Sequence, residues 1–413
     1  MGGAYSLSFT VLAPDAPDEL RIEATEQRFS DATMTVGFSE SIGQDIALSS
    51  IEISTIDELQ AIQTDSDFPL DGYYKQTADI DASGFGSFQP IGDEIVPFSG
   101  TFDGKKFAIS NLNIENEGEP NSFFRFISED GVLKDVRLKG VKVNAASNGP
   151  AGLVGVNRGL IESIYLKGII IGDLISVGGV VSKNYGVIKS VEANVTVEGA
   201  FDTGGLVSFN SGMIRDAHVT GEISGGNNIG GVVGRNGGSG TVMNSSSSVN
   251  ISSNTDNMGG IAGESGGKIE SCFSNSTLSG KSSVGGVVGL IEGGEVSNSY
   301  SIGSIDGNSE VGGLAGTNND GEISKSFAAG DISGSSDVGG LTGVNGGTLS
   351  STVWDTEASS QSSGVGRGDA AGTTGLTTSE MQGNSAEENM DGFDFQNTWQ
   401  VVIGDYPALQ WEE

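Results

Sequence analysis

A block of about 27 residues, built around the sequence Gly-Gly-Leu/Val-Val/Ala-Gly, recurs eight times between residues 151 and 343. The copies open at Ala151-Gly152, Gly178-Gly179, Gly204-Gly205, Gly230-Gly231, Gly259-Gly260, Gly285-Gly286, Gly312-Gly313 and Gly339-Gly340, so successive starts lie 26 to 29 residues apart. A period this regular is typical of a solenoid, in which each repeat stacks on the one before it. The repeat therefore constrains the architecture before any single side chain is considered.

Within a copy, short runs of alternating small apolar and polar residues are interrupted by Gly and Asn, as in residues 311–334. An apolar spacing of two predicts strands, and frequent Gly and Asn disfavour a helix. Strands this short bury a face only when similar coils pair above and below them. The sequence predicts an all-β fold: a parallel β-helix (β-solenoid) with about 27 residues and three short strands per coil. The second glycine of the pair, as at Gly205, Gly231 and Gly286, is expected where a side chain would strike the adjacent strand or require positive φ.

The chain divides into four predicted segments. Residues 1–50 hold apolar stretches at 5–12 and 34–38 and read as an N-terminal, strand-rich cap or attachment segment. Residues 51–147 are expected to form irregular opening coils of the solenoid, residues 148–350 the regular repeats, and residues 351–413 the C-terminal closing segment. The apolar mass of that segment is Trp354, Phe393, Phe395, Trp399 and Trp411. Both ends need such covers because terminal strands present unpaired edges.

The repeats resemble the GLUG family, which is named for its Gly-Leu-small-Gly signature. Ile56-Asp-Glu-Leu-Gln-Ala-Ile62 and Phe98-Ser-Gly-Thr-Phe-Asp-Gly104 look like the segment that precedes such repeats, and Tyr406-Pro-Ala-Leu-Gln-Trp411 looks like the segment that closes them. The resemblance covers roughly residues 50 to 413. It implies a β-solenoid of the kind found in bacterial and archaeal surface proteins and in adhesin-like or IgA-protease-like secreted chains, and it brings no shared catalytic residues.

Asparagine recurs at one position of the repeat, six residues after its start. The members of this series are Asn157, Asn184, Asn210, Asn236, Asn318 and Asn345, with Ser265 and Ile291 in the two remaining copies. Stacked amides can hydrogen-bond along the axis of a solenoid. A structural ladder is therefore expected here rather than a ligand site.

A second series is aromatic. Its members are Tyr165, His218, Phe273, Tyr300 and Phe327, with Glu192 as the exception. Coils in register would place these rings about 4.8 Å apart, which suits offset stacking. Facing inward they would be core, the usual fate of aromatics; facing outward they would form a flat strip that can pack on sugar rings.

The charge balance limits the partners. Fifty-four acidic against 20 basic residues give a formal net charge of −34, which is far from the pattern that neutralises phosphates, so nucleic acid is not expected as a partner. A solvated acidic surface is the favoured interpretation of the carboxylates. Asp79, Asp81 and Asp103 are the candidates for a calcium site if they gather at one rim. No other cofactor is expected.

The residues needed for catalysis are sparse. Cys272 is the only cysteine and occupies a small, mostly apolar slot of the repeat, so it is expected to fill the core. His218 is the only histidine, and any Ser-His-Asp arrangement would depend on it. Acidic residues in the repeats are scattered and arginine is scarce, so no paired-carboxylate site is evident.

These observations favour a non-enzymatic extracellular protein, secreted or at the cell surface: an adhesin or stalk-like β-solenoid that binds a glycan or a surface protein. Two alternatives stay open. One is a polysaccharide-active β-helix enzyme, a lyase or hydrolase; the other is a subunit of an extracellular filament that self-associates through its terminal strands. No stretch of the sequence is long and apolar enough to span a bilayer, and no secretory signal is recognisable in it.

Overall fold

The computed structural model describes residues 19–23, 33–37, 50–115, 120–145, 149–172 and 176–412. Contacts within the chain define two units, Met1–Ser49 and Ser50–Glu413. In the first, β1 (Glu19–Glu23) and β2 (Thr33–Gly37) pair antiparallel. The predicted strand at 34–38 thus corresponds to β2, whereas the apolar stretch at 5–12 lies outside the described residues.

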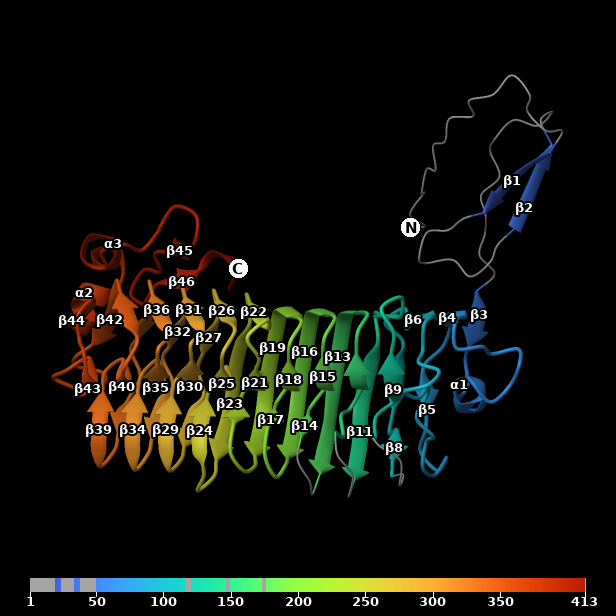
Figure 1. The fold of residues 1–413 in the computed structure, drawn as a ribbon, viewed down its shortest axis with the longest axis horizontal. Helices are drawn as coiled ribbons and strands as arrows, with labels where there is room; N and C mark the ends of the chain where they lie inside the picture. Colours follow the sequence, from blue (N-terminus) through green and yellow to red (C-terminus); the bar gives the residue numbers. More distant parts are fainter. Residues whose placement is uncertain are drawn as a thin grey trace. The chain divides into compact units, whose positions relative to one another are not determined.

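The second unit is a stack of coils with one repeat in each coil of the repeat region (Figure 1). Its strands pair in parallel, and Val154, Val181, Val207 and Val233 are successive partners in one register. Each partner is the same position of the next repeat. The prediction of a parallel β-solenoid with one repeat per coil is confirmed.

The described residues of this unit form three parallel sheets of 25, 10 and 7 strands, here called the wide, ten-stranded and seven-stranded sheets. The ten-stranded sheet contains β9 (Phe124–Ile127), β12 (Val154–Asn157), β15 (Val181–Asn184), β18 (Val207–Asn210), β21 (Val233–Asn236), β25 (Ala262–Ser265), β30 (Val288–Glu292), β35 (Ala315–Asn319), β40 (Thr342–Asn345) and β43 (Val365–Gly368). The seven-stranded sheet contains β14 (Val177–Gly178), β17 (Thr203–Gly204), β20 (Ile229–Gly230), β24 (Asp256–Gly259), β29 (Ser282–Gly285), β34 (Ser309–Gly312) and β39 (Ser336–Gly339).

The wide sheet begins with the opening coils, which contribute β3 (Ile51–Ile53), β4 (Tyr73–Gln76), β5 (Ile80–Asp81), β6 (Thr101–Asp103), β7 (Ala108–Ser110), β8 (Asn113–Ile114), β10 (Val132–Lys134) and β11 (Arg137–Ala145). The next coils contribute β13 (Leu160–Gly172), β16 (Val187–Glu198), β19 (Met213–Ser224), β22 (Thr241–Met243) and β23 (Ser246–Ser252). The last contribute β26 (Lys268–Glu270), β27 (Phe273–Ser274), β28 (Thr277–Ser279), β31 (Glu295–Ser297), β32 (Tyr300–Ser301), β33 (Ser304–Asp306), β36 (Glu322–Ser324), β37 (Phe327–Ala328), β38 (Ile332–Ser333), β41 (Thr348–Ser350), β42 (Thr352–Asp355) and β44 (Thr373–Leu376).

The wide sheet bends at a corner that recurs in successive coils. Ser163, Ser190 and Asp216 adopt positive φ there, at 57°, 57° and 55°. Short polar side chains tolerate the left-handed region better than branched or bulky ones, which explains the residue types at this corner. In these coils the strand continues through the corner as one long element, whereas from residue 241 onward it is divided into separate short strands.

The interior of the coils is a continuous apolar core of Val, Ile and Leu side chains. The glycine pairs let adjacent coils approach each other closely. A Cβ on Gly205, Gly231 or Gly286 would collide with the carbonyl oxygen of a glycine in the next coil. Close approach, and not positive φ, is therefore the reason for glycine at these positions.

Helix α1 (Ile56–Ala61) lies at the N-terminal end of this unit. Thr55 and Glu58 form a reciprocal capping box that fixes its first turn. Leu59 and Ile62 are fully buried in the main core beside Ile53 and Tyr74. This segment therefore covers the first coils.

The closing segment contains α2 (Thr378–Met381), α3 (Asn384–Asn389), the antiparallel pair β45 (Trp399–Gln400) and β46 (Ala408–Leu409), and a final 3₁₀ turn (Gln410–Glu412). We expected its aromatic side chains to close the end of the stack. Only Trp354 belongs to the main core; Trp399, Phe393, Phe395 and Trp411 form a second cluster on the flank of the wide sheet. The segment folds back along the coils, as Figure 1 shows above β31, β32 and β36.

Candidate functional site

The asparagine series forms a buried ladder, as predicted. Asn157 donates from Nδ2 to Oδ1 of Asn184 at 2.8 Å, Asn184 to Asn210 at 2.8 Å, and Asn210 to Asn236 at 2.9 Å. Asn236 continues to Ser265 Oγ at 3.2 Å, and after the gap at Ile291 the ladder resumes with Asn318 and Asn345 at 2.9 Å. Because these amides are almost fully buried and bonded to one another, they are structural and offer nothing to a ligand.

The last three members of the aromatic series stack in register but not inside the coils, and Ser246 holds this position between His218 and Phe273. Phe273 and Tyr300 lie 5.1 Å apart between ring centroids with 10° between their planes, and Tyr300 and Phe327 lie 4.8 Å apart at 5°. These rings face away from the main core and belong to the second cluster. The expectation that these rings point into the coil interior is wrong. Tyr300 and Phe327 point outward and are buried by the closing segment. Their strip is therefore not free for sugar rings.

Three hydrogen bonds hold the end of the closing segment against the wide sheet beside this strip. Trp411 donates from Nε1 to the Ser271 carbonyl at 2.9 Å, the Tyr300 hydroxyl donates to the Glu412 carboxylate at 2.9 Å, and the Tyr406 hydroxyl donates to Asp355 at 2.7 Å. Burial raises the pKa of Glu412 above its ordinary value, although the bonds from Leu409 and Tyr300 oppose the rise.

The first two members of the aromatic series, Tyr165 and His218, lie outside this cover. Tyr165 is half-buried and His218 is exposed. His218 Nδ1 lies 2.6 Å from Ser246 Oγ, but Ser246 is only 2% exposed, so its hydroxyl is poorly placed to attack a substrate. Cys272 is buried, and burial raises the pKa of its thiol to about 12, which confirms the core-filling prediction.

The three candidate calcium ligands do not converge. Asp79 accepts a bond from the Ala108 amide at 2.7 Å, and Asp81 accepts from Asn111 Nδ2 at 2.8 Å. The buried Asp103 is paired with Lys105 at 2.7 Å and Lys134 at 3.4 Å. Although burial opposes it, these lysines keep the pKa of Asp103 below its ordinary value. Within the described ranges no group of three or more His, Cys, Asp or Glu side chains is arranged to hold a metal ion, so the expected gathering of these three carboxylates is wrong.

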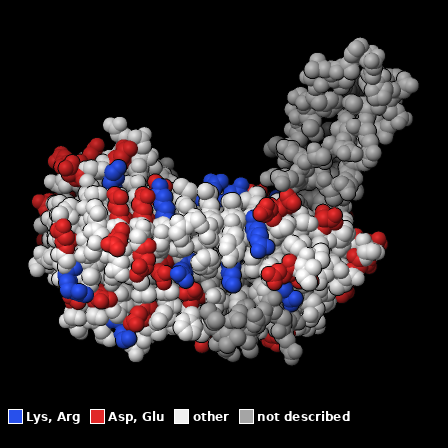
Figure 2. Space-filling view, viewed as in Figure 1, with Lys and Arg blue, Asp and Glu red and all other residues white. Residues whose placement is uncertain are grey.

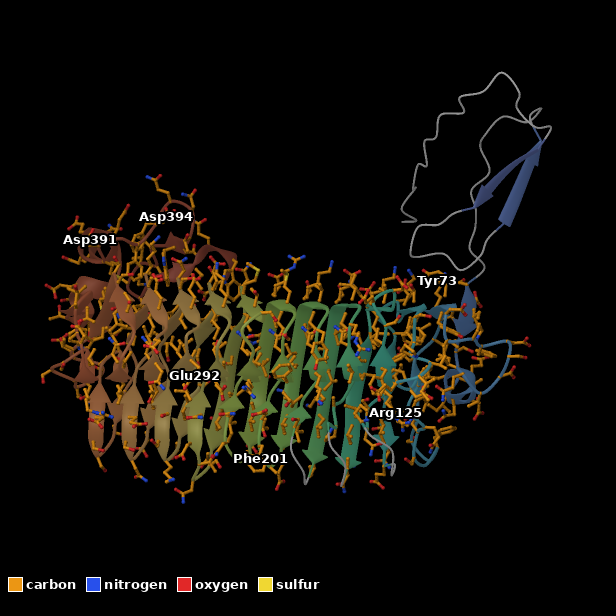
Figure 3. The ribbon with its side chains drawn as sticks, viewed as in Figure 1. Tyr73, Arg125, Phe201, Glu292, Asp391 and Asp394 are labelled. Carbon is orange, nitrogen blue, oxygen red and sulfur yellow. The ribbon has the colours of Figure 1, made fainter. Side chains whose placement is uncertain are left out.

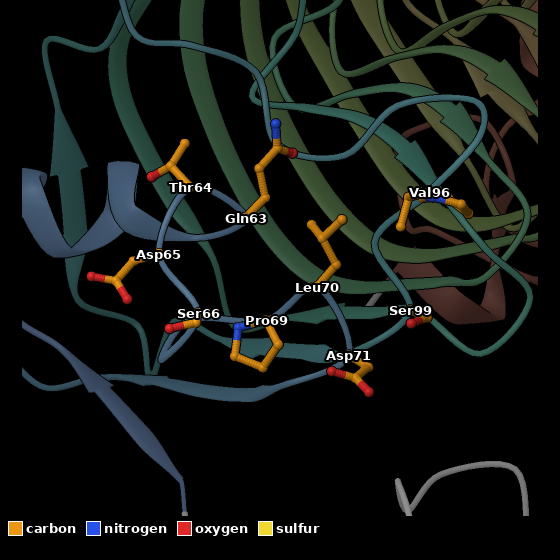
Figure 4. Close-up of a pocket in the computed structure, with 10 residues that line it drawn as sticks. Gln63, Thr64, Asp65, Ser66, Pro69, Leu70, Asp71, Val96 and Ser99 are labelled. Carbon is orange, nitrogen blue, oxygen red and sulfur yellow. The ribbon is translucent and has the colours of Figure 1, made fainter.

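A cleft of about 430 Å³ lies beside α1, between the loop after that helix and the loop at 96–99 (Figure 4). Gln63, Asp65, Leu70, Asp71 and Val96 are among the residues that line it. Its lining is neutral apart from the carboxylates of Asp65 and Asp71, and it includes no histidine, cysteine, lysine or arginine. The cleft therefore does not define an active site.

The outer faces of the ten-stranded and seven-stranded sheets carry mostly isolated charges. Arg125 on β9 and Glu292 on β30 project from the ten-stranded sheet, and Asp391 and Asp394 project from the closing segment (Figure 3). Acidic side chains dominate the visible surface over the C-terminal coils, and basic ones occur singly (Figure 2). Some of these basic groups pair with neighbouring carboxylates, as Arg235 does with Glu264 at 3.0 Å and Arg367 with Asp337 at 3.3 Å.

The closing segment leaves part of the wide sheet uncovered, and we call this part the open face. It comprises the outward side chains of β11, β13, β16 and β19: Arg137, Lys139, Lys142, Tyr165, Lys167, Ile169, Glu192, Asn194, Thr196, His218, Thr220 and Glu222. These residues alternate with buried ones along each strand, and the four strands are the longest in the molecule's described part, at 9, 13, 12 and 12 residues. The open face is therefore broad, regular and accessible.

Sequence reasoning identified Tyr165 and His218 on this face but missed its lysines. Lys139 and Lys167 are 28 positions apart in the sequence and become neighbours only through the strand register. Isolated lysines in an acidic chain gave no signal. Register between coils is the information that would have found them.

The chain is similar to known proteins only in part or at low identity. No family model matches the chain. Over 143 residues, 32% of this chain, it is 32% identical to halomucin of Haloquadratum walsbyi, and it spans only 2% of that protein. Among solved structures, a putative immunoglobulin A1 protease from Bacteroides ovatus is similar over 88% of this chain and 92% of its own, at 20% identity and a TM-score of 0.36. An IgA1 protease is similar over 78% of this chain and 22% of its own, at 16% identity and a TM-score of 0.31. Scores this low transfer no chemistry, and the fold stands on the strand register described above.

No helix in the described part of the chain is long and apolar enough to cross a membrane.

Proposed function

We propose that this chain is part of a non-enzymatic extracellular surface protein, adhesin-like or stalk-like, whose solenoid binds a glycan or a protein partner. The observation that carries the proposal is the open face: a broad sheet surface on which the same outward positions repeat in register from coil to coil. A surface of this kind suits a repetitive partner, because weak contacts made at each coil add together.

Three further observations support an extracellular setting. The net charge of −34 suits a long rod that must stay soluble. The repeats carry the GLUG-type signature, and membership of that family is part of the proposal. The partial likeness to halomucin agrees with a setting of this kind, although it covers 32% of the chain.

The test is to incubate the full chain with acidic and neutral polysaccharides and to measure both binding and breakdown. We expect saturable binding without new reducing ends or unsaturated products. Sustained product formation that disappears in His218→Ala or Ser246→Ala, the one Ser-His contact in the described residues, would overturn the proposal in favour of an enzyme.

A further inference from the structure

Four cations gather at one end of the open face, across two adjacent coils. Arg137, Lys139 and Lys142 project from β11, and Lys167 projects from β13. Lys139 and Lys167 are direct partners in the parallel register. We propose that this group, called the basic patch, together with the ring of Tyr165, binds an anionic glycan that carries carboxylate or sulfate groups. The inference rests on the proposed function and names the glycan class.

The cations of the basic patch have no acidic partner among the described residues. None of the four cations forms an ion pair within the part of the chain that the structure describes, whereas Lys189 pairs with Glu162 at 2.5 Å and Lys268 with Glu270 at 3.0 Å. Like charges directly opposite each other on a sheet are destabilising. The clustering is what sets these cations apart: in a chain with 54 acidic residues, four of them lie on two adjacent coils with no ion pair among the described residues, so their charge is available to an external anion.

The backbone of β11 places the third cation on the patch. Lys139 and Lys142 are three residues apart, an odd spacing that would put them on opposite faces of a regular strand. The register shifts between Lys139 and Val141, and Gly140 adopts a φ of 69°. This bulge inserts one residue, so Val141 stays in the core and Lys142 points outward with Lys139.

Tyr165 adds a flat apolar surface beside the cations. The Arg137 guanidinium lies 5.2 Å from the centroid of its ring, within the range of a cation–π contact. Arg137 Nε is buried and has no hydrogen-bond partner in the structure. Further along the same strand, beyond Lys167, the side chain of Ile169 is 43% exposed. A sugar ring could pack on these apolar surfaces while its acidic group meets the cations.

The shape of the basic patch favours a single extended glycan over other polyanions. It is two coils wide, about 5 Å between strands, and roughly 15 Å long. Carboxylates border it on the following coils, where Glu192 is the partner of Tyr165 and Glu222 is the partner of Thr196. A nucleic acid duplex or an acidic protein would extend over these carboxylates and be repelled. Ser110, Asn113 and Asn194 supply neutral hydrogen-bonding groups on the adjoining strands.

The experiment measures binding of the full chain to polygalacturonate, dextran sulfate and neutral dextran at about 0.15 M and at higher NaCl. The test variants are Lys139→Gln/Lys167→Gln and Tyr165→Ala. The matched controls are Arg158→Gln/Lys183→Gln, which removes the same charge from exposed residues beside and on the ten-stranded sheet, and Tyr185→Ala, which removes a ring that is 48% exposed there. Circular dichroism and the melting temperature of every variant report whether it folds.

We expect the acidic glycans to bind in a salt-dependent way and neutral dextran to bind at least about tenfold more weakly. The double lysine variant should lose about tenfold or more, because each charge-assisted contact contributes substantially to affinity. The controls should stay within about twofold. Anionic glycan should also raise the melting temperature of the wild type but not of the double lysine variant.

Equal losses in test and control variants, or tighter binding of single-stranded DNA or polyglutamate than of either acidic glycan, would overturn the basic patch. So would the absence of acidic-glycan binding by a folded wild type. Tight, salt-independent binding of neutral dextran by every variant would overturn the patch and leave the proposed function standing. Breakdown of the polysaccharide would instead overturn the proposed function.

Discussion

The two halves of the wide sheet share one register between coils but present different surfaces. Tyr165, Glu192 and His218 are in the same register position as Phe273, Tyr300 and Phe327. In the first half this position is exposed or half-buried beside unpaired cations; in the second half it is a stack of rings beneath the closing segment. The repeat thus dictates where a side chain points, and a segment outside the repeat decides whether it meets solvent.

The largest test of this contrast removes one ring from each half. Phe327→Ala should destabilise by about 3–5 kcal/mol, because it empties a fully buried site in the second cluster. Tyr165→Ala should cost less than about 1 kcal/mol, because its ring is half-buried and leaves no closed cavity. Chemical denaturation followed by circular dichroism and tryptophan fluorescence provides the measurement. Similar losses in the two variants would mean that the closing segment does not stay on the strip.

A second test asks whether the closing segment affects the stability of the coil interior. Gly205 belongs to a coil of the open half and Gly286 to a coil of the covered half. In Gly205→Val and Gly286→Val, the added side chain meets a glycine carbonyl of the next coil. Both should destabilise by about 1–3 kcal/mol. Gly238→Ala is the control, since its nearest neighbour to an added Cβ is 3.8 Å away. A cost that differs strongly between Gly205 and Gly286 would show that the cover also stabilises the interior.

A smaller effect should appear on changing pH, in the covered half only. The pKa of Glu412 is raised in the folded chain above its ordinary value of 4.5, chiefly by burial. The protonated form is therefore favoured in the folded state, so its contribution is complete below pH 4.5 and is lost as the pH rises through the raised pKa. Acrylamide quenching of tryptophan fluorescence should show a better-protected closing segment at acidic pH.

The control for this titration is Glu412→Gln, which keeps the shape and cannot ionise. Its quenching should be independent of pH across the same window. If the wild type and this variant show the same pH dependence, Glu412 is not the group responsible.

The smallest effect should be common to both halves. Added NaCl should raise the melting temperature by screening the net charge of −34, with most of the gain reached near about 0.1 M, where the Debye length is about 10 Å. A midpoint that falls steadily with NaCl would contradict this. Calcium at micromolar concentration should do no more than NaCl of equal ionic strength; a larger rise would show a specific site that the separated Asp79, Asp81 and Asp103 do not explain.

Periodicity predicted what depends on one coil meeting the next. The register of the valines, the asparagine ladder and the glycine contacts all follow from a repeat of about 27 residues. The covering of Tyr300 and Phe327 could not be predicted, because no pattern within the repeat says over which flank residues 378–411 fold. The basic patch was missed because its lysines are isolated in the sequence and become neighbours only through the register between coils, which the bulge at Gly140 alters. The asparagine ladder could be predicted because buried amides need hydrogen-bond partners, and in a stack of repeats the same amide of the next coil provides one.

The direction of the hydrogen bonds between coils has a mechanical consequence. They run along the rod, so a force applied to the two ends of the solenoid loads them one coil after another, as in opening a zipper. Each coil released would lengthen the chain by roughly 90 Å at about 3.4 Å per residue. The closing segment changes where this can start, because Trp411 is tied to Ser271, 140 residues earlier in the chain. Force applied at the C-terminus must first detach the closing segment from the wide sheet. Because this segment contacts the coils from Phe273 to Phe327, those coils should resist tension together.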